Sequence, residues 1–263
     1  MGPRAKTRRD KRGAFARALS ARARVAPVAV MICTAACSDP IPTSELRAEF
    51  RVASLVDRML VQARFKSCEF VVATDSGTGY YTCTESSLLD SSDSLSVEIR
   101  GSRYWLAQKP GDRYEVELPD SLPGEVYTVV LERPNSEDAP RSTATLPPPF
   151  SFGGAPATAS RAEDGIELDL ELPVGWDPFI GETWLCGNYL AIGDADWQFD
   201  RTQNRLWMEP GTLERPAEAE GRPLECEVHV IVSLLSNGQL DPAFQAGFID
   251  GEQSRVVSFT SVP

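Results

Sequence analysis

The sequence has 263 residues, of which 26 are Lys or Arg and 38 are Asp or Glu, so its formal net charge is −12. The first 36 residues hold nine of the basic side chains and a single acid, Asp10, which leaves a net charge of −20 for residues 37–263. This composition argues against nucleic acid or anionic headgroups as partners, since both require clustered Lys and Arg.

The N-terminal segment has the pattern of a secretory signal. Basic residues run from Arg4 to Arg24, and an apolar run over residues 25–36 follows them. This run is too short to span a bilayer as a stable helix and Pro27 interrupts it, so we expect a cleaved signal rather than a retained membrane helix.

The apolar run ends in Thr34-Ala35-Ala36-Cys37. These residues resemble the lipobox of bacterial lipoproteins, in which small residues precede a cysteine that is diacylated and becomes the mature N-terminus. The resemblance covers this segment alone and departs from the family at Thr34, where an aliphatic residue is usual. It implies a signal peptide over residues 1–36 and a lipid on Cys37 that anchors the protein in a bilayer through its acyl chains. Ordinary cleavage after an Ala-x-Ala-like site, with release of the protein, is the alternative.

The residue after the cysteine bears on location. In lipoproteins of this kind an aspartate there retains the protein in the inner membrane, and here the position is Ser38. The resemblance therefore implies the outer membrane. Residues 37–44, with Pro40 and Pro42, read as a tether between the anchor and the first folded domain.

Period-two alternation dominates from Glu45 onward, which favours strands, although a helix face also fits the residues from Leu46 to Leu60. The first domain is expected to cover residues 45–147. We expect its strands over residues 49–54, 60–65, 70–73, 80–83, 95–99, 104–107, 114–118, 127–132 and 142–146. The turn signal Asp75-Ser76-Gly77-Thr78-Gly79 separates two of them.

Three consecutive prolines, Pro147 to Pro149, mark a domain boundary because they cannot join a central ladder. The second domain then covers residues 148–263, with strands expected over residues 166–172, 183–187, 206–208, 226–232 and 255–260. Strand spacing and cysteine placement resemble the immunoglobulin-like modules of bacterial surface proteins. The sequence therefore predicts an all-β chain with two tandem antiparallel β-sandwich domains after the signal peptide.

Four cysteines remain once Cys33 in the signal and Cys37 are set aside: Cys68, Cys83, Cys186 and Cys226. An even number of cysteines in an exported protein predicts disulfides. Three pairings are open, and sequence proximity with the two-domain interpretation favours Cys68 with Cys83 and Cys186 with Cys226. A zinc site is the competing interpretation, but His229 is the only histidine and no Cys-x-x-Cys pair exists.

Catalytic motifs are missing from the sequence. It contains no Gly-rich phosphate loop, no His-Glu-x-x-His and no Gly-x-Ser-x-Gly. His229 alternates with Cys226 across the strand over residues 226–232, so we expect it to face solvent. Acid pairs are so frequent that a glycosidase-type couple stays open. We expect no catalytic residue and no cofactor.

One acidic segment has a partial metal pattern. Acids at the first, third and seventh positions from Asp194 are spaced as in a calcium loop. Phe199 occupies the position that requires glycine, and Arg205 the position that requires an acid. We expect an acidic turn and no metal.

Four of the five tryptophans lie in the second domain: Trp176, Trp184, Trp197 and Trp207. Trp176 and Trp197 fall in expected loops, and exposed rings beside carboxylates suit sugar rings, so these two are the candidate ligand-binding residues. The interpretation we prefer is that Trp184 and Trp207 fill the core and the other two cover its ends.

These observations predict an exported, lipid-anchored envelope protein that acts as a structural or protein-interaction module. The alternative is a surface lipoprotein that binds carbohydrate, and a hydrolase with acidic catalytic residues is less favoured. The expected partners are an envelope protein or a glycan.

Overall fold

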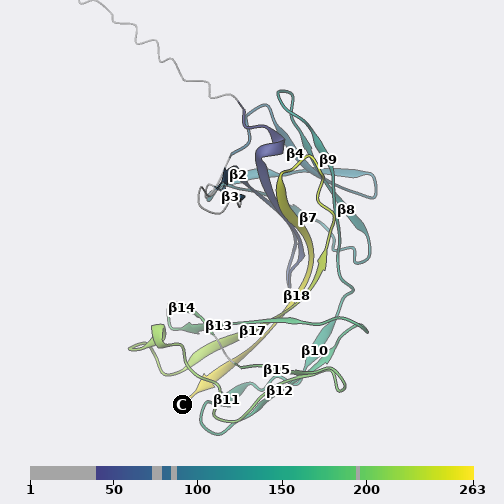
Figure 1. Ribbon diagram of the computed structural model, residues 1–263. Coiled ribbons are helices and arrows are strands. Elements are labelled where there is room, and N and C mark those ends of the chain that lie inside the picture. The colour runs from purple at the N-terminus through teal and green to yellow at the C-terminus, as the bar shows by residue number, and fades with distance from the viewer. Residues whose placement is uncertain (1–39, 73–78, 84–87, 194–195) are drawn as a thin grey trace, which may run out of the picture. The chain divides into compact units, whose positions relative to one another are not determined.

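The structure, a computed structural model, describes residues 40–72, 79–83, 88–193 and 196–263 (Figure 1). Cys37, most of the turn that follows Asp75, and Asp194 lie outside these residues. Within them the chain is all-β, and this part of the predicted fold is confirmed: strands β1 to β18 are joined by loops and by the short 3-10 helices Thr43–Glu45 (η1) and Ala217–Ala219 (η2). No helix in this part of the chain is long and apolar enough to cross a membrane.

The largest sheet, called the long sheet here, holds ten of the described strands. Its order is β14-β13-β17-β18-β1-β2-β7-β6, with β11 also paired to β18 and β3 to β2. The strands are β1 Leu46–Ser54, β2 Met59–Val72, β3 Gly79–Cys83, β6 Ala107–Lys109, β7 Arg113–Leu118, β11 Thr158–Ser160, β13 Phe179–Cys186, β14 Tyr189–Ile192, β17 Cys226–Asn237 and β18 Ala246–Val262.

Two smaller sheets of four described strands complete the fold. The first small sheet has the order β5-β4-β8-β9, and the second has the order β10-β12-β16-β15. The strands are β4 Ser94–Ile99, β5 Ser102–Trp105, β8 Val126–Glu132, β9 Ala139–Thr145, β10 Ser151–Gly153, β12 Ile166–Glu171, β15 Gln198–Asp200 and β16 Arg205–Met208.

Each small sheet packs on the long sheet around its own apolar core. Phe65 of β2 and Val129 of β8 belong to the first core, and Leu168 of β12 and Val230 of β17 belong to the second. β18 contributes Ile249 to the first core and Phe259 to the second. These two residues are an even number of positions apart on one strand, so both cores use the same face of the long sheet. We call the opposite face the outer face.

Alternation places the core residues as the sequence predicts. In β12 the residues Ile166, Leu168 and Leu170 are buried, and the three acids between and after them are exposed. In β17 every second residue from Cys226 to Leu234 is buried. This period of two is the backbone geometry of a strand with one wet face.

The last strand joins the two cores. The sequence predicts it over residues 255–260, whereas β18 begins at Ala246. Its first eight residues pair with β1 in parallel, and residues 250–261 pair with β17 in the antiparallel sense. The long sheet is therefore mixed, and the predicted second domain donates a strand segment to the sheet that covers the first core.

Gly247 permits the parallel pairing. Its φ is +132°, and a Cβ atom at this position would lie 1.8 Å from the carbonyl oxygen of Ala48 on β1. Only glycine avoids this collision, so the contact between β18 and β1 depends on that residue.

Both disulfides are present, with the pairing that sequence proximity favours. Cys68 and Cys83 are directly opposite on β2 and β3, so their bond ties these two strands together. Cys186 and Cys226 link the end of β13 to the start of β17 at the edge of the second core. Two disulfides are typical of a protein that folds in an oxidising compartment outside the cytoplasm.

Candidate functional site

A cleft of about 180 Å³ lies where the loop after β12 meets the turn between β15 and β16. Trp176 and Phe199 give it aromatic walls, and both are half-buried against the second core. Polar groups come from Asp177, Arg201 and Asn204, of which Asp177 and Arg201 form an ion pair. Apolar rings beside hydrogen-bonding groups are the composition of a small-molecule site.

Local hydrogen bonds hold this cleft in place. The backbone carbonyl of Asn204 accepts a hydrogen bond of 2.7 Å from the amide of Leu170, which fixes the turn to β12. The Asp200 carboxylate accepts hydrogen bonds of 2.6 Å from the Thr202 hydroxyl and 2.8 Å from its backbone amide. These bonds stabilise the charged carboxylate and lower the pKa of Asp200. The turn that carries Arg201 is thus held by its own residues.

Trp197 has a different environment from Trp176. Its indole nitrogen donates a hydrogen bond of 2.8 Å to one carboxylate oxygen of Glu182, and the indole of Trp184 donates to the other. The Glu182 side chain is buried, and it lies on the core side of β13 with Trp184. Trp197 is not among the described residues that line the cleft. That Trp197 contacts a ligand stays a prediction.

Trp184 and Trp207, the other two tryptophans after residue 147, differ in burial. Trp184 is fully buried in the second core. Trp207 is half-buried and projects from the opposite side of β16, because Leu206 and Met208 occupy the core positions. The expectation that Trp207 fills the core is therefore wrong, and the period of two along β16 explains why.

His229 lies on the outer face, opposite Cys226, with 27% of its side chain exposed. Its Nδ1 atom is 2.6 Å from the hydroxyl oxygen of Ser258, and its Nε2 atom is 4.0 Å from a carboxylate oxygen of Glu227. The second distance exceeds a hydrogen bond, so Glu227 does not orient the ring as a general base requires.

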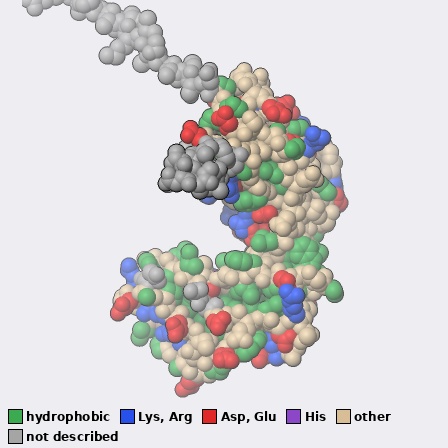
Figure 2. Space-filling model, in the orientation of Figure 1, with side chains coloured by type: hydrophobic (Ala, Val, Ile, Leu, Met, Phe, Trp, Pro, Cys, Tyr) green, Lys and Arg blue, Asp and Glu red, His purple; other side chains and the backbone are tan. Residues whose placement is uncertain are grey.

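One half of the outer face carries several exposed apolar side chains among polar ones such as Glu227 and His229, and we call it the apolar half. It is formed by β13, β14 and β17 with the adjoining part of β18. Strongly exposed side chains here include Ile192 (82%), Leu190 (64%) and Phe179 (64%). The register places Leu190 beside Leu185 on β13, and Ile231 of β17 beside Val256 of β18. Figure 2 shows hydrophobic side chains at the surface in this part of the molecule.

The other half of the outer face is charged, and we call it the charged half. It comprises the outward residues of β1, β2, β6, β7 and the start of β18: the basic Arg47, Arg51, Arg64, Lys66, Lys109 and Arg113, and the acidic Glu49, Glu115, Glu117, Asp250 and Glu252. Basic residues thus outnumber acids here, although residues 37–263 as a whole carry a charge of −20.

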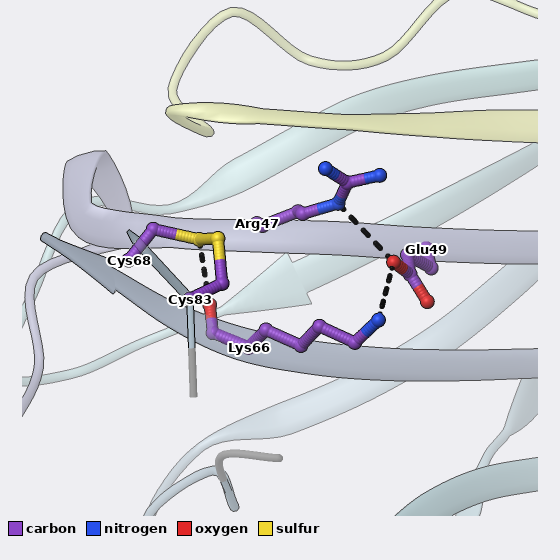
Figure 3. The surroundings of a disulfide bond; sticks show 5 residues. All are labelled: Arg47, Glu49, Lys66, Cys68 and Cys83. Atoms are coloured by element: carbon purple, nitrogen blue, oxygen red, sulfur yellow. Dashed lines mark hydrogen bonds and ion pairs between the residues drawn. A yellow bond between two sulfur atoms is a disulfide. The ribbon is translucent and has the colours of Figure 1, made fainter. Parts of the chain in front are cut away.

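Most carboxylates of the charged half already have cationic or polar partners. Glu49 accepts hydrogen bonds of 3.1 Å from Arg47 and 2.9 Å from Lys66, next to the disulfide of Cys68 (Figure 3). The buried Glu252 is paired with Arg51. The pair of Lys66 with Glu49 connects β2 to β1, and the pair of Arg51 with Glu252 connects β1 to β18.

In the described residues, no three His, Cys, Asp or Glu side chains gather into a potential metal site. The acidic segment with the partial calcium pattern begins at Asp194, outside the described residues. What the fold and these surfaces define is an all-β protein with two disulfides, one small aromatic cleft and a broad open sheet face. No protein-family model matches the sequence, and no curated protein sequence matches it significantly.

Proposed function

We propose that this is an exported protein, lipid-anchored at Cys37 in the outer membrane, that works as a protein-interaction module. The basic and apolar N-terminal pattern, the lipobox-like Thr34 to Cys37 segment and the two disulfides support the location. We include in the proposal that the two halves are immunoglobulin-like sandwich modules. Its support is that each core is enclosed between two sheets.

The observation that carries the proposed function is the apolar half of the outer face. Exposed apolar patches on monomeric proteins are small, and larger ones mark interaction sites. Burial of such a patch contributes about 25 cal/mol per Å² of apolar area. An open sheet face with several aliphatic side chains fits an apolar protein surface better than a small ligand, because nothing encloses a ligand there. The charged half is continuous with the apolar half along β18, so the partner surface carries an acidic flank.

Site-specific photo-crosslinking in cells tests this proposal. We expect a crosslinker at Ile192 or Val256 to give the same discrete protein adduct. The matched control positions are Val126 and Leu88, which are exposed but lie outside the apolar half. The adduct should disappear when Phe179→Asp is added. Equal adducts from all four positions, or an adduct indifferent to Phe179→Asp, would show that the apolar half has no partner.

Lipid attachment has its own test. We expect Cys37→Ala to abolish incorporation of labelled fatty acid and to release the protein from the membrane fraction. Unchanged processing and membrane association would leave the anchor proposal without support, whereas the crosslinking result would still stand.

The Trp176 cleft favours a second candidate function, binding of a glycan. A sugar ring stacks its apolar face on an aromatic ring and directs its hydroxyls to groups such as Asp177 and Arg201. The cleft is smaller than the ~300 to 1,000 Å³ of drug-sized sites, so it suits one sugar residue of a chain. We expect separated envelope polysaccharide to quench tryptophan fluorescence in the wild type and in Trp197→Phe but not in Trp176→Phe. Equal quenching in both variants would remove the cleft as the site.

A further inference from the structure

Three cations form a row across the charged half of the outer face. Arg64 of β2 is directly opposite Arg113 of β7, and Arg113 is directly opposite Lys109 of β6. We call these three residues the cation row. Directly opposite side chains on neighbouring strands have Cβ atoms about 5 Å apart, so each adjacent pair places two like charges side by side.

This arrangement costs stability rather than adding to it. Like charges at directly opposite positions destabilise a sheet, and within the described residues neither Arg64 nor Lys109 has an ion-pair partner. Arg113 is 2.7 Å from a carboxylate oxygen of Glu115, which compensates one charge of three. That oxygen also accepts a hydrogen bond of 2.6 Å from Gln62. Among the described residues the row thus keeps two cations without an ion pair, and one of them, Arg64, is directly opposite Glu49 of β1.

The surroundings of the row are open to a ligand. Lys109, Arg113 and Arg58 line a cleft of about 490 Å³. Glu115 and Glu117 line the same cleft, so it holds three cations and two carboxylates. Both Arg64 and Lys109 are exposed. Arg64 is directly opposite Glu49 of β1, and Glu49 is directly opposite Phe248 of β18. Phe248 is 42% exposed. An apolar contact therefore lies at the end of this line of directly opposite residues.

We propose that the cation row binds an acidic segment of the protein partner. This inference rests on the proposed function, in which a partner protein covers the apolar half. It assigns a negative charge to the part of that partner that would lie over the charged half. Protein carboxylates fit three side chains spread across three strands, because an extended acidic segment presents several separate charges. Guanidinium groups bind carboxylates with charge-assisted hydrogen bonds. Electrostatic complementarity of this kind raises the association rate and selects among partners.

The test uses a fluorescent hexaglutamate peptide as the probe, with hexaglutamine as the uncharged control. We expect the protein to bind hexaglutamate at low salt, and 0.5 M NaCl to abolish this binding because it screens exposed charges. Arg64→Gln combined with Lys109→Gln should weaken the affinity at least about tenfold. Arg100→Gln with Arg103→Gln removes the same charge from paired, exposed sites and should change it less than about twofold.

A second readout does not need the peptide. We expect Lys109→Gln to raise the melting temperature, because it removes one like-charge contact from the row. Equal weakening by both double variants, no preference for hexaglutamate over hexaglutamine, or a lower melting temperature would overturn the proposal. Binding through the row to phosphatidylglycerol vesicles or to inorganic phosphate in place of hexaglutamate would also overturn it, and would assign the row to phosphate groups.

The crosslinking experiment separates this inference from the function on which it rests. If the adduct at Ile192 forms and peptide binding is absent, the interaction function stands and the acidic segment is wrong. If the adduct is absent and the row still binds hexaglutamate, the row is an anion site without the proposed protein interface.

Discussion

Arg133 and Asp93 form an ion pair of 3.0 Å in which the two side chains are only 2% and 1% exposed. The guanidinium also donates hydrogen bonds of 2.7 Å to the carbonyl of Ile41 and 3.1 Å to the hydroxyl of Thr43. Arg133 follows β8 and Asp93 precedes β4, so the ion pair links two strands of the first small sheet. The hydrogen bonds of Arg133 to Ile41 and Thr43 join that sheet to the start of the described chain. Thr43, expected as part of the tether, is fully buried.

We expect Arg133→Leu to lower the free energy of unfolding by about 3 to 5 kcal/mol, because it leaves the Asp93 carboxylate buried without its cation. Urea denaturation followed by tryptophan fluorescence measures the loss. Adding Asp93→Leu should recover part of it, since the uncompensated charge is then gone.

Arg100→Leu is the matched control for that variant. Arg100 is 59% exposed in its ion pair with Glu125, and exposed pairs contribute less than about 1 kcal/mol. A loss for Arg133→Leu no larger than for Arg100→Leu would contradict a structural role for the buried pair.

Gly247→Ala tests the parallel pairing of β18 with β1. The new Cβ atom would collide with the carbonyl of Ala48, and φ at this position is +132°, so the strand must move or separate. We expect a loss of at least about 2 kcal/mol and faster hydrogen exchange of the amides of β1. Gly153→Ala is the control, because open space surrounds that position. Similar stability of the two variants would show that the collision relaxes without cost.

The two disulfides are expected to contribute differently to the stability of the protein. The bond between Cys186 and Cys226 joins residues 40 positions apart, and the bond between Cys68 and Cys83 joins residues 15 apart. In the chain-entropy model these loops correspond to about 4 and about 3 kcal/mol. We expect paired Cys→Ser variants to lose stability in this order in urea denaturation. The reverse order would mean that strain or residual unfolded structure outweighs the loop length.

Sequence patterns predict individual strands well in this chain because burial on one face leaves a period of two. The acids that alternate along β12 and the valines that alternate along β17 carry that signal locally. The pairing of Arg47 with Ala246 carries no such signal, since it joins distant segments in a parallel register. A boundary at three prolines is visible in the sequence, but a strand shared between two cores is not.

The candidate sites also divide into features that the sequence predicts and features that only the fold brings together. Trp176 is recognisable as a loop tryptophan beside an acid, and the structure adds Phe199 from β15 and Arg201 from the turn after it. The cation row is invisible in sequence because Arg64, Lys109 and Arg113 become neighbours only through the pairing of three strands. The net charge of −20 for residues 37–263 conceals it, since a total says nothing about segregation over the surface.

The titration of Asp250 on the outer face makes the free energy of unfolding depend on pH. Burial raises the pKa of its carboxyl above the ordinary 3.8, Arg51 opposes this shift and Glu252 adds to it. The folded state therefore holds the proton to a higher pH than the unfolded state does. Between the two pKa values the folded state binds more protons, so the free energy of unfolding falls as pH rises through this range.

We expect Asp250→Asn to be more stable than the wild type at pH 7 and to lose this advantage as the pH falls below about 4, where Asp250 is protonated in both states.

Asp200→Asn is the control of opposite sign. The pKa of Asp200 is lowered by the hydrogen bonds from Thr202, so its ionised form stabilises the fold above the unfolded pKa and that contribution disappears in acid. Asp200→Asn should therefore be less stable than the wild type at pH 7 and approach it as the pH falls. Urea denaturation at pH 7, 5 and 3 measures both variants. A pH-independent difference for Asp250→Asn would show that burial does not raise the pKa of the Asp250 carboxyl.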